Sequence, residues 1–299
     1  MANPIHILLV DDDTNYSQLL GTKARTFGMK LNPFTNFEEG LQELRDYPFK
    51  YKGLIFDARC LIKKKQEIPH DKALSFAIAD LQAIENELNI TYPLAVNTGY
   101  IDFFLEEQDL IHKRRSKIFN KGLSGDDDAL FLFLQEKIHH SAAWKYADIF
   151  EIFDSGYLTD IFRTKLLYIL QQEDNIHEQQ NVFAAIRVIQ EEIYRQILQR
   201  YPAAVPNYPN PSFSDKNKHL SGNKQGRNFY SSVFQTSTID YLANAIYRIA
   251  SDYGSHLPQR PTNVPVIYWE TPSVYATKSL IFALMEQLLW LKTLMTATT

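Results

Sequence analysis

The chain is poor in cysteine, since Cys60 is its only one among 299 residues. No disulfide can form within the chain, which excludes a small secreted scaffold stabilised by such bonds. Long apolar runs are also missing. The run at 5–10 is too short for a signal peptide, and Glu286 and Gln287 interrupt the longest stretch, at 280–291. We therefore expect a cytoplasmic protein without a membrane-spanning segment.

Neither sign of charge is in large excess. Residues 1–140 carry 17 basic and 21 acidic side chains, and residues 141–299 carry 14 of each. Duplex DNA binding depends on an excess of basic groups, and the second half also lacks a helix-turn-helix pattern. We therefore expect no specific binding to duplex DNA. The length and the apolar fraction of 45% are those of a globular chain of about two domains.

Apolar runs and helical patterns alternate along residues 1–140. The runs are typical of buried parallel strands and lie near residues 5–10, 30–34, 53–57, 92–97 and 117–121. Helices are expected between and after them, near residues 14–27, 37–46, 73–88, 101–112 and 127–139. This alternation predicts an α/β fold with a doubly wound sheet of five parallel strands.

Polar residues stand where four of these strands end. Asp11, Asp12 and Asp57 would bring three carboxylates to one edge of the sheet, beside the Thr98 hydroxyl and the Lys121 ammonium. Carboxylates that lie so close need a cation, and Mg²⁺ suits them because it leaves positions open for phosphate oxygens. One carboxylate can then act as the nucleophile that accepts a phosphoryl group. The sequence therefore predicts a site that handles a phosphoryl group.

An acidic residue after a strand also has a simpler role as the N-cap of the next helix. We expect Asp13 or Thr14 to cap the helix at 14–27.

In order and residue type, these stretches resemble the receiver domain of two-component response regulators, over about residues 4–140. The resemblance implies a flavodoxin-like fold. It also implies that Mg²⁺ is held by the carboxylates of Asp11, Asp12 and Asp57 and by the backbone carbonyl of Arg59.

The resemblance assigns the remaining roles as well. Asp57 would take a phosphoryl group from a histidine kinase or a phosphotransfer protein. Thr98 would turn its hydroxyl toward the aspartyl phosphate, and Lys121 would neutralise it. The only chemistry implied is that of a phospho-acceptor that also releases its phosphate.

Some positions depart from the receiver pattern. Gly122 stands where proline usually follows the lysine, and Ile118 stands where an aromatic switch residue is common, with Phe119 next to it. The loop after the phospho-acceptor is long, and its lysines at 63–65 are interpreted as solvated, with a kinase-docking surface as the alternative. Cys60 in this loop is interpreted as a small apolar residue, with a redox sensor as the alternative.

Residues 141–299 predict an all-α bundle that would form the output domain. Helical apolar spacing occurs at 143–155, 157–173, 176–201, 236–251 and 272–296. Four prolines after Tyr201 predict a long loop at about 202–234. Its stretch 213–228 carries four positive charges and one negative charge, and we interpret it as a solvated loop. The alternative is a loop that follows the phosphates of an RNA or a nucleotide.

About residues 175–296 resemble, more weakly, the helix pair of HEPN-type domains found in many defence ribonucleases. In the catalytic members an arginine lies several residues before a histidine. Here Arg248 and His256 are separated by seven residues, one more than usual, so the match is partial. The resemblance implies RNA binding or RNA cleavage, with the histidine as acid or base. The simpler role of His256 is a hydrogen-bonded loop residue after a helix C-cap at Gly254.

Three functions remain open at this point. The leading hypothesis is a response regulator whose phosphorylation on Asp57 is read by an unusual helical domain. The second is a ribonuclease or RNA-binding protein gated by the receiver. The third is a receiver fused to a bundle that binds a protein partner or forms a homodimer, which needs an exposed apolar face on the helix at 272–296.

Overall fold

The computed structural model of the protein describes residues 4–66, 68, 72–99, 111, 113–202, 212–222, 235–254 and 273–297. The chain divides into two compact units, Met1–Lys145 and Tyr146–Thr299. From the sequence, the boundary was expected at residue 140.

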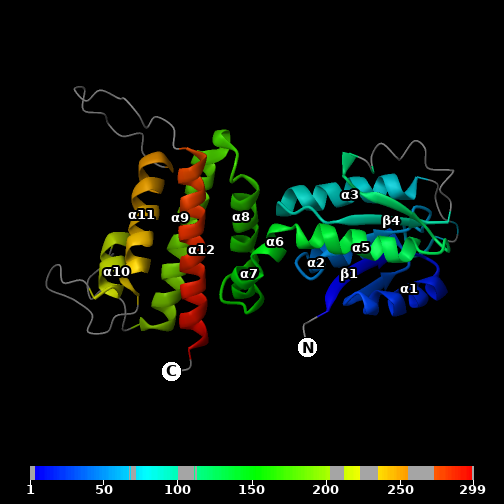
Figure 1. Ribbon diagram of the computed structural model, residues 1–299, viewed down its shortest axis with the longest axis horizontal. Helices are drawn as coiled ribbons and strands as arrows, with labels where there is room; N and C mark the ends of the chain where they lie inside the picture. The colour runs from blue at the N-terminus through cyan, green and yellow to red at the C-terminus, as the bar shows by residue number, and fades with distance from the viewer. Residues whose placement is uncertain are drawn as a thin grey trace. The chain divides into compact units, whose positions relative to one another are not determined.

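The first unit contains a sheet of five parallel strands in the order β2-β1-β3-β4-β5. The strands are β1 (Ile5–Val10), β2 (Met29–Phe34), β3 (Gly53–Phe56), β4 (Leu94–Thr98) and β5 (Lys117–Asn120). The helices are α1 (Thr14–Thr26), α2 (Phe37–Asp46), α3 (Ala73–Leu88), α5 (Asp126–His139) and the short α6 (Ala142–Lys145), as Figure 1 shows. This strand order is that of the flavodoxin-like doubly wound fold, in which the chain changes direction between β1 and β3. The predicted fold class is confirmed.

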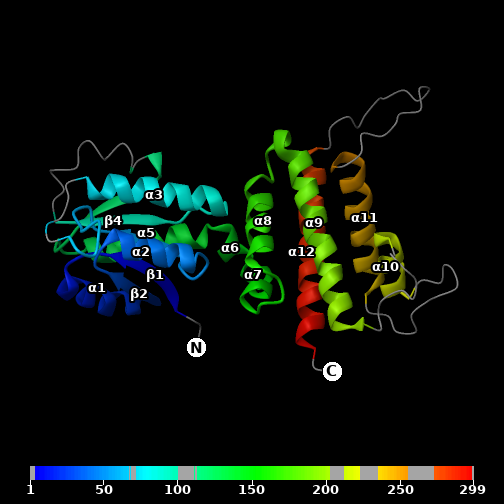
Figure 2. The same cartoon turned by 180° about the vertical axis from the view of Figure 1, so that it is seen from behind.

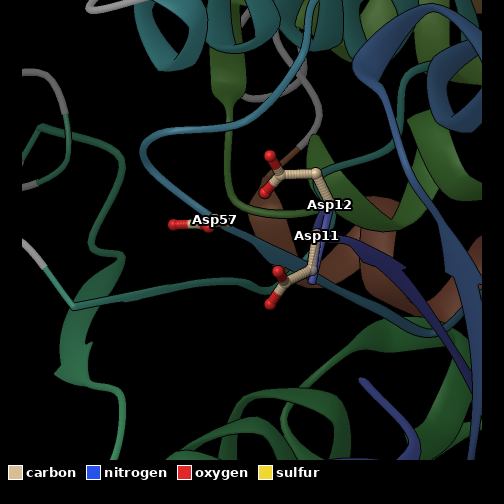
Figure 3. A group of neighbouring side chains, drawn as sticks. All are labelled: Asp11, Asp12 and Asp57. Carbon is tan, nitrogen blue, oxygen red and sulfur yellow. The ribbon is translucent and has the colours of Figure 1, made fainter. Parts of the chain in front are cut away.

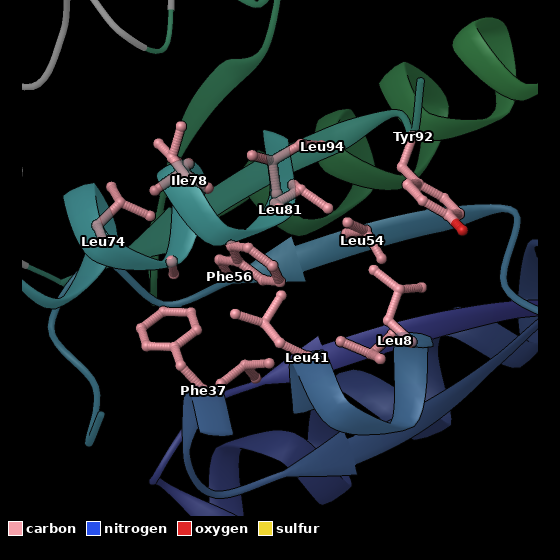
Figure 4. Packing of buried hydrophobic residues seen from close by; sticks show 14 of the residues in the cluster. Leu8, Phe37, Leu41, Leu54, Phe56, Leu74, Ile78, Leu81, Tyr92 and Leu94 are labelled. Carbon is pink, nitrogen blue, oxygen red and sulfur yellow. The ribbon is translucent and has the colours of Figure 1, made fainter. Parts of the chain in front are cut away.

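Alternate strand residues feed two separate cores, one on each face of the sheet. On one face, Leu8 of β1 and Phe56 of β3 pack against Phe37 and Leu41 of α2 and against α3 (Figure 4). On the other face, Ile55 and its neighbours pack against α1 and α5. Strands β3 and β4 are buried along their whole length. This burial explains why the sequence shows them as continuous apolar runs.

Two side-chain caps start helices directly after strands of the sheet. The Asp13 carboxylate accepts hydrogen bonds of 3.0 Å from the N–H groups of Asn15 and Tyr16 at the start of α1, as one of the two expected caps. The Asn36 side chain accepts a hydrogen bond of 2.9 Å from the N–H of Glu39 in α2. The connections from β1 to α1 and from β2 to α2 are therefore only a few residues long.

In the second unit, all the regular secondary structure of the described residues is helical, as predicted. Its helices are α7 (Ala147–Asp154), α8 (Asp160–Gln171), the 3₁₀ helix η2 (Ile176–Glu178), α9 (Gln179–Arg200), α10 (Phe213–Leu220), α11 (Ser237–Gly254) and α12 (Val274–Thr296). Helices α9, α11 and α12 pack on one another, and they lie side by side in the front and back views (Figure 1 and Figure 2).

Helix α12 turns most of its apolar stripe into this bundle. Leu280, Ile281, Leu284 and Leu288 are buried. By length and composition alone α12 could cross a membrane, but half of its apolar window is buried inside the protein, as in the core helix of a globular bundle. The stripe is therefore core, and it does not provide the exposed apolar face that a partner-binding or homodimeric bundle would need.

The structure differs from the sequence expectations at two places in this half. The helix expected at 143–155 is divided into α6 and α7, with a break at Tyr146. Helix α10 forms inside the segment expected to be a loop. It starts after the last proline with a capping box, in which Ser212 accepts from the N–H of Asp215 and the Asp215 side chain accepts in return.

Two expected features lie outside the described residues. They are the helix at 101–112, apart from 111, and the loop segments 203–211 and 223–234.

Candidate functional site

Asp11, Asp12 and Asp57, the acidic trio, lie together at the carboxyl ends of β1 and β3 (Figure 3). One oxygen from each carboxylate lies within 4.8 Å of those from the other two. Strand pairing extends up to this point, because the Asp57 N–H donates to the Val10 carbonyl at 2.8 Å and the Asp11 N–H donates to the Phe34 carbonyl at 2.9 Å. The sheet backbone therefore fixes where these carboxylates start.

Lys121, which follows β5, joins two members of the trio. Its Nζ lies 2.7 Å from Oδ2 of Asp11 and 2.7 Å from Oδ2 of Asp57. The other oxygens of these two carboxylates accept backbone N–H groups, from Asp13 at 3.0 Å and from Arg59 at 3.2 Å. One ammonium is thus shared by two buried carboxylates.

The site carries more negative than positive charge, and both burial and the neighbouring charges shift the pKa values of its groups. Burial raises the pKa of Asp11 to about 6, although Lys121 acts against the shift. Burial also raises the pKa of Asp57, again against Lys121. For Lys121, burial alone would lower the pKa, but Asp57 and Asp11 outweigh it, so the pKa of the ammonium is raised.

The donor set fits a divalent cation. Two carboxylates are buried and share one ammonium, and Asp12, which is half-buried, forms no hydrogen bond or ion pair with its side chain within the described ranges. Three carboxylate oxygens this close, with a deficit of positive charge, form the hard oxygen environment that Mg²⁺ prefers. The trio is therefore a candidate metal site.

The other predicted site residues also lie at this edge. Thr98 ends β4 and is fully buried, and its carbonyl accepts the Lys121 N–H at 3.0 Å. Strand β4 lies between β3 and β5, so Thr98 stands between the strand that leads to Asp57 and the strand that leads to Lys121. Arg59 is placed by its N–H bond to Asp57.

The sequence did not single out three residues that lie beside the site, which are Tyr16, Asn97 and Asp127. The Lys121 Nζ lies over the Tyr16 ring, 5.1 Å from its centroid. The Tyr16 hydroxyl donates to Oδ1 of Asp127 at 2.8 Å and accepts from Nδ2 of Asn97 at 2.7 Å. Burial raises the pKa of Tyr16. An aromatic residue in a first helical turn has no distinguishing signal, because the contact arises only when α1, β4 and α5 are packed together.

The departures from the receiver pattern have local explanations. Gly122 has a φ of 80°, which a proline ring cannot adopt, and no cis peptide occurs among the described residues. Ile118 packs on the α2–α3 side of the sheet, whereas Phe119 is buried on the α1–α5 side, 5.8 Å from the ring of Phe133.

The loop after Asp57 is held against the start of α2. The Phe37 N–H donates to the Leu61 carbonyl at 3.0 Å, and the Lys64 Nζ lies 2.7 Å from Oε1 of Glu39. Cys60 is fully buried and donates to the Thr35 carbonyl, and burial raises the pKa of its thiol. These features favour a small apolar residue over a redox sensor.

The second candidate site gains no support from the described residues. Arg248 is exposed on α11, and His256 lies outside the described residues. No feature of the described helices supports the HEPN resemblance.

The strand order and the acidic trio with its lysine fit a receiver domain. No protein-family model matches the chain. No curated protein matches it either. Among solved structures, the chain is similar to one described as the crystal structure of a response regulator receiver domain protein from Clostridium thermocellum. The match has 16% identity and a TM-score of 0.35, and it covers 45% of this chain and 94% of that one. The fold is assigned from the strand order alone.

Proposed function

We propose that the protein is a two-component response regulator in which Asp57 accepts a phosphoryl group from a histidine kinase or a phosphotransfer protein. The observation that carries the proposal is the convergence of three carboxylates and one ammonium at the strand ends. In a doubly wound fold, ligands bind at this edge, near the point where the strand order reverses.

Asp57 is the acceptor in this proposal because it stands at the phospho-acceptor position of the receiver pattern, directly after β3. Its carboxylate contacts the ammonium and a backbone N–H, as that of Asp11 also does. An oxygen of this carboxylate attacks the phosphorus of a phosphohistidine, the P–N bond breaks, and its electron pair stays on the imidazole nitrogen. Asp11, Asp12, Asp57 and the Arg59 carbonyl would hold Mg²⁺. When bound, this ion supplies positive charge to the phosphoryl oxygens.

Lys121 and Thr98 stabilise the phosphorylated form. The Lys121 ammonium follows the negative charge from the carboxylate to the phosphoryl oxygens, and the Thr98 hydroxyl donates to one of them. Phosphorylation favours the active form only as far as these contacts are better there than in the resting form. The helical unit then reads this shift as the output domain of a cytoplasmic protein. Arg248 alone gives no ground for assigning it ribonuclease activity.

Phosphorylation with a small donor tests the proposal. Full-length protein incubated with phosphoramidate and Mg²⁺ should gain one phosphate by intact mass, whereas the Asp57→Asn variant should gain none. The matched control is Asp80→Asn, which changes an exposed aspartate of α3 and should be labelled like the wild type. If the Asp57→Asn protein is labelled as well as the wild type, Asp57 is not the acceptor.

A further inference from the structure

Tyr16 touches the site through its ring. The Lys121 ammonium lies over the ring face, 5.1 Å from its centroid, while it also bonds Asp11 and Asp57. A cation over an aromatic face is attracted by the ring, and more strongly when both are shielded from water. The Lys121 side chain is only 16% exposed, so this contact is well shielded.

The ring cannot turn freely, because its hydroxyl is held from two sides. It accepts from Nδ2 of Asn97 at 2.7 Å and donates to Oδ1 of Asp127 at 2.8 Å. Asn97 is buried in β4 directly before Thr98. The Oδ1 of Asn97 has no hydrogen-bond partner among the described residues. The orientation of the Asn97 amide therefore depends on the bond from its Nδ2 to the Tyr16 hydroxyl.

Asp127 connects this arrangement to α5. It lies in the first turn of α5. The Nζ of Lys23 in α1 lies 3.8 Å from Oδ2 of Asp127 and 3.1 Å from Oδ1 of Asp128. A contact chain therefore runs from the ammonium, through the Tyr16 ring and hydroxyl, to the start of α5.

We infer that Tyr16 is a positioning residue, which holds the Lys121 ammonium at the acidic trio through its ring and ties that ammonium to the first turn of α5 through its hydroxyl. The inference rests on the proposed function and adds to it a regulatory path. When the ammonium turns to the oxygens of a phosphoryl group on Asp57, it leaves the ring face. The hydroxyl bonds to Asn97 and Asp127 then readjust, and α5 responds.

The ring can be tested separately from the hydroxyl. In the full-length protein with phosphoramidate and Mg²⁺, Tyr16→Leu should slow labelling roughly tenfold, because the ring no longer holds the ammonium at the acidic trio, where it meets the incoming phosphoryl group. Tyr16→Phe keeps the ring and should rescue the rate. The matched control is Tyr47→Leu, which removes an exposed ring that also lies under a lysine, with the Lys50 Nζ 5.2 Å from its centroid. A Tyr16→Leu protein that is labelled like the Tyr47→Leu control would overturn the positioning role.

The hydroxyl is tested by hydrogen exchange with and without beryllofluoride and Mg²⁺. In the wild type, exchange of peptides from 126–139 should change when the phosphate mimic binds. In Tyr16→Phe, which lacks the hydroxyl, this change should be lost while the change around Asp57 remains. An equal change at 126–139 in both proteins would overturn the path to α5.

A double-mutant cycle keeps the test independent of phosphorylation. Urea unfolding is used to compare Tyr16→Leu, Lys121→Met and the double variant. The change in the unfolding equilibrium constant of the double variant should differ roughly tenfold from the product of the two single changes. Strict additivity would overturn the ring contact even if the protein is labelled normally. The opposite outcome is also informative. If the two substitutions are coupled but the wild type is not labelled, the proposed function is rejected while the ring contact is supported.

Discussion

Lys121 illustrates how strongly a single residue determines the site. Two buried carboxylates share its ammonium, and the pKa of Asp11 is nevertheless raised to about 6 because burial outweighs the attraction. A buried ion pair that is incompletely compensated stabilises a fold poorly, and groups with shifted pKa values cluster at functional sites. The acidic trio is therefore costly to the resting protein and suited to a second cation.

His219 gives a prediction for the helical unit. It is buried in α10, and burial lowers its pKa below the ordinary value of 6.5. The folded state therefore binds fewer protons at this ring than the unfolded state between the lowered pKa and 6.5, so stability falls as the pH decreases through that range.

Urea unfolding of the wild type and of His219→Gln at about pH 7.5 and about pH 5.5 checks this expectation. The variant should lose less stability between the two pH values. An equal loss in the two proteins would show that His219 does not contribute to the pH dependence.

Among the elements, α2 approaches the sheet closely at Gly40. A Cβ added at Gly40 would lie 2.6 Å from Cγ2 of Val10 in β1, so the helix can lie this close only because the residue is a glycine. Gly21 of α1 differs, since an added Cβ would have nothing within 4 Å.

These two glycines should respond to alanine with opposite signs. Gly40→Ala should destabilise the protein by about 1–2 kcal/mol, because strain at the stiff Val10 side chain exceeds the gain in helix propensity. Gly21→Ala should stabilise it by about 0.5–1 kcal/mol through helix propensity alone. Urea unfolding measures both, and a stabilised Gly40→Ala protein would contradict the close packing of α2 on β1.

The elements also show what a sequence reveals. Strands β3 and β4 were predictable because a strand buried on both faces is an apolar run. The meeting of Asp57, Thr98 and Lys121 followed from the parallel strand ends alone. Helix α10 was missed, because the prolines before it hid the capping signal of Ser212. The contact of Tyr16 with Lys121 was missed because it depends on how separate elements pack.

For the whole molecule, the two units differ in kind. The first is an α/β sheet with its polar site at one edge, and the second is an α-helical bundle whose longest helix, α12, turns an apolar stripe into the core. Residues 141–299 carry 14 basic and 14 acidic side chains, so the helical half provides no overall excess of positive charge.

This balance predicts that the protein does not bind duplex DNA specifically at physiological salt, because such binding depends on neutralising phosphates with basic groups. Selection of bound fragments from a genomic library checks the prediction, with protein phosphorylated and unphosphorylated. We expect no enriched sequence in either sample. One enriched motif would restore the interpretation as a transcription factor.

The position of the phosphoryl group tests the central claim most directly. Full-length protein phosphorylated with phosphoramidate and Mg²⁺ is reduced with borohydride, which converts an aspartyl phosphate into homoserine, and its peptides are sequenced by mass spectrometry. The account predicts homoserine in place of Asp57 and nowhere else, with Asp11 and Asp12 unchanged. Homoserine at another aspartate, or a phosphate that resists the reduction, would contradict it.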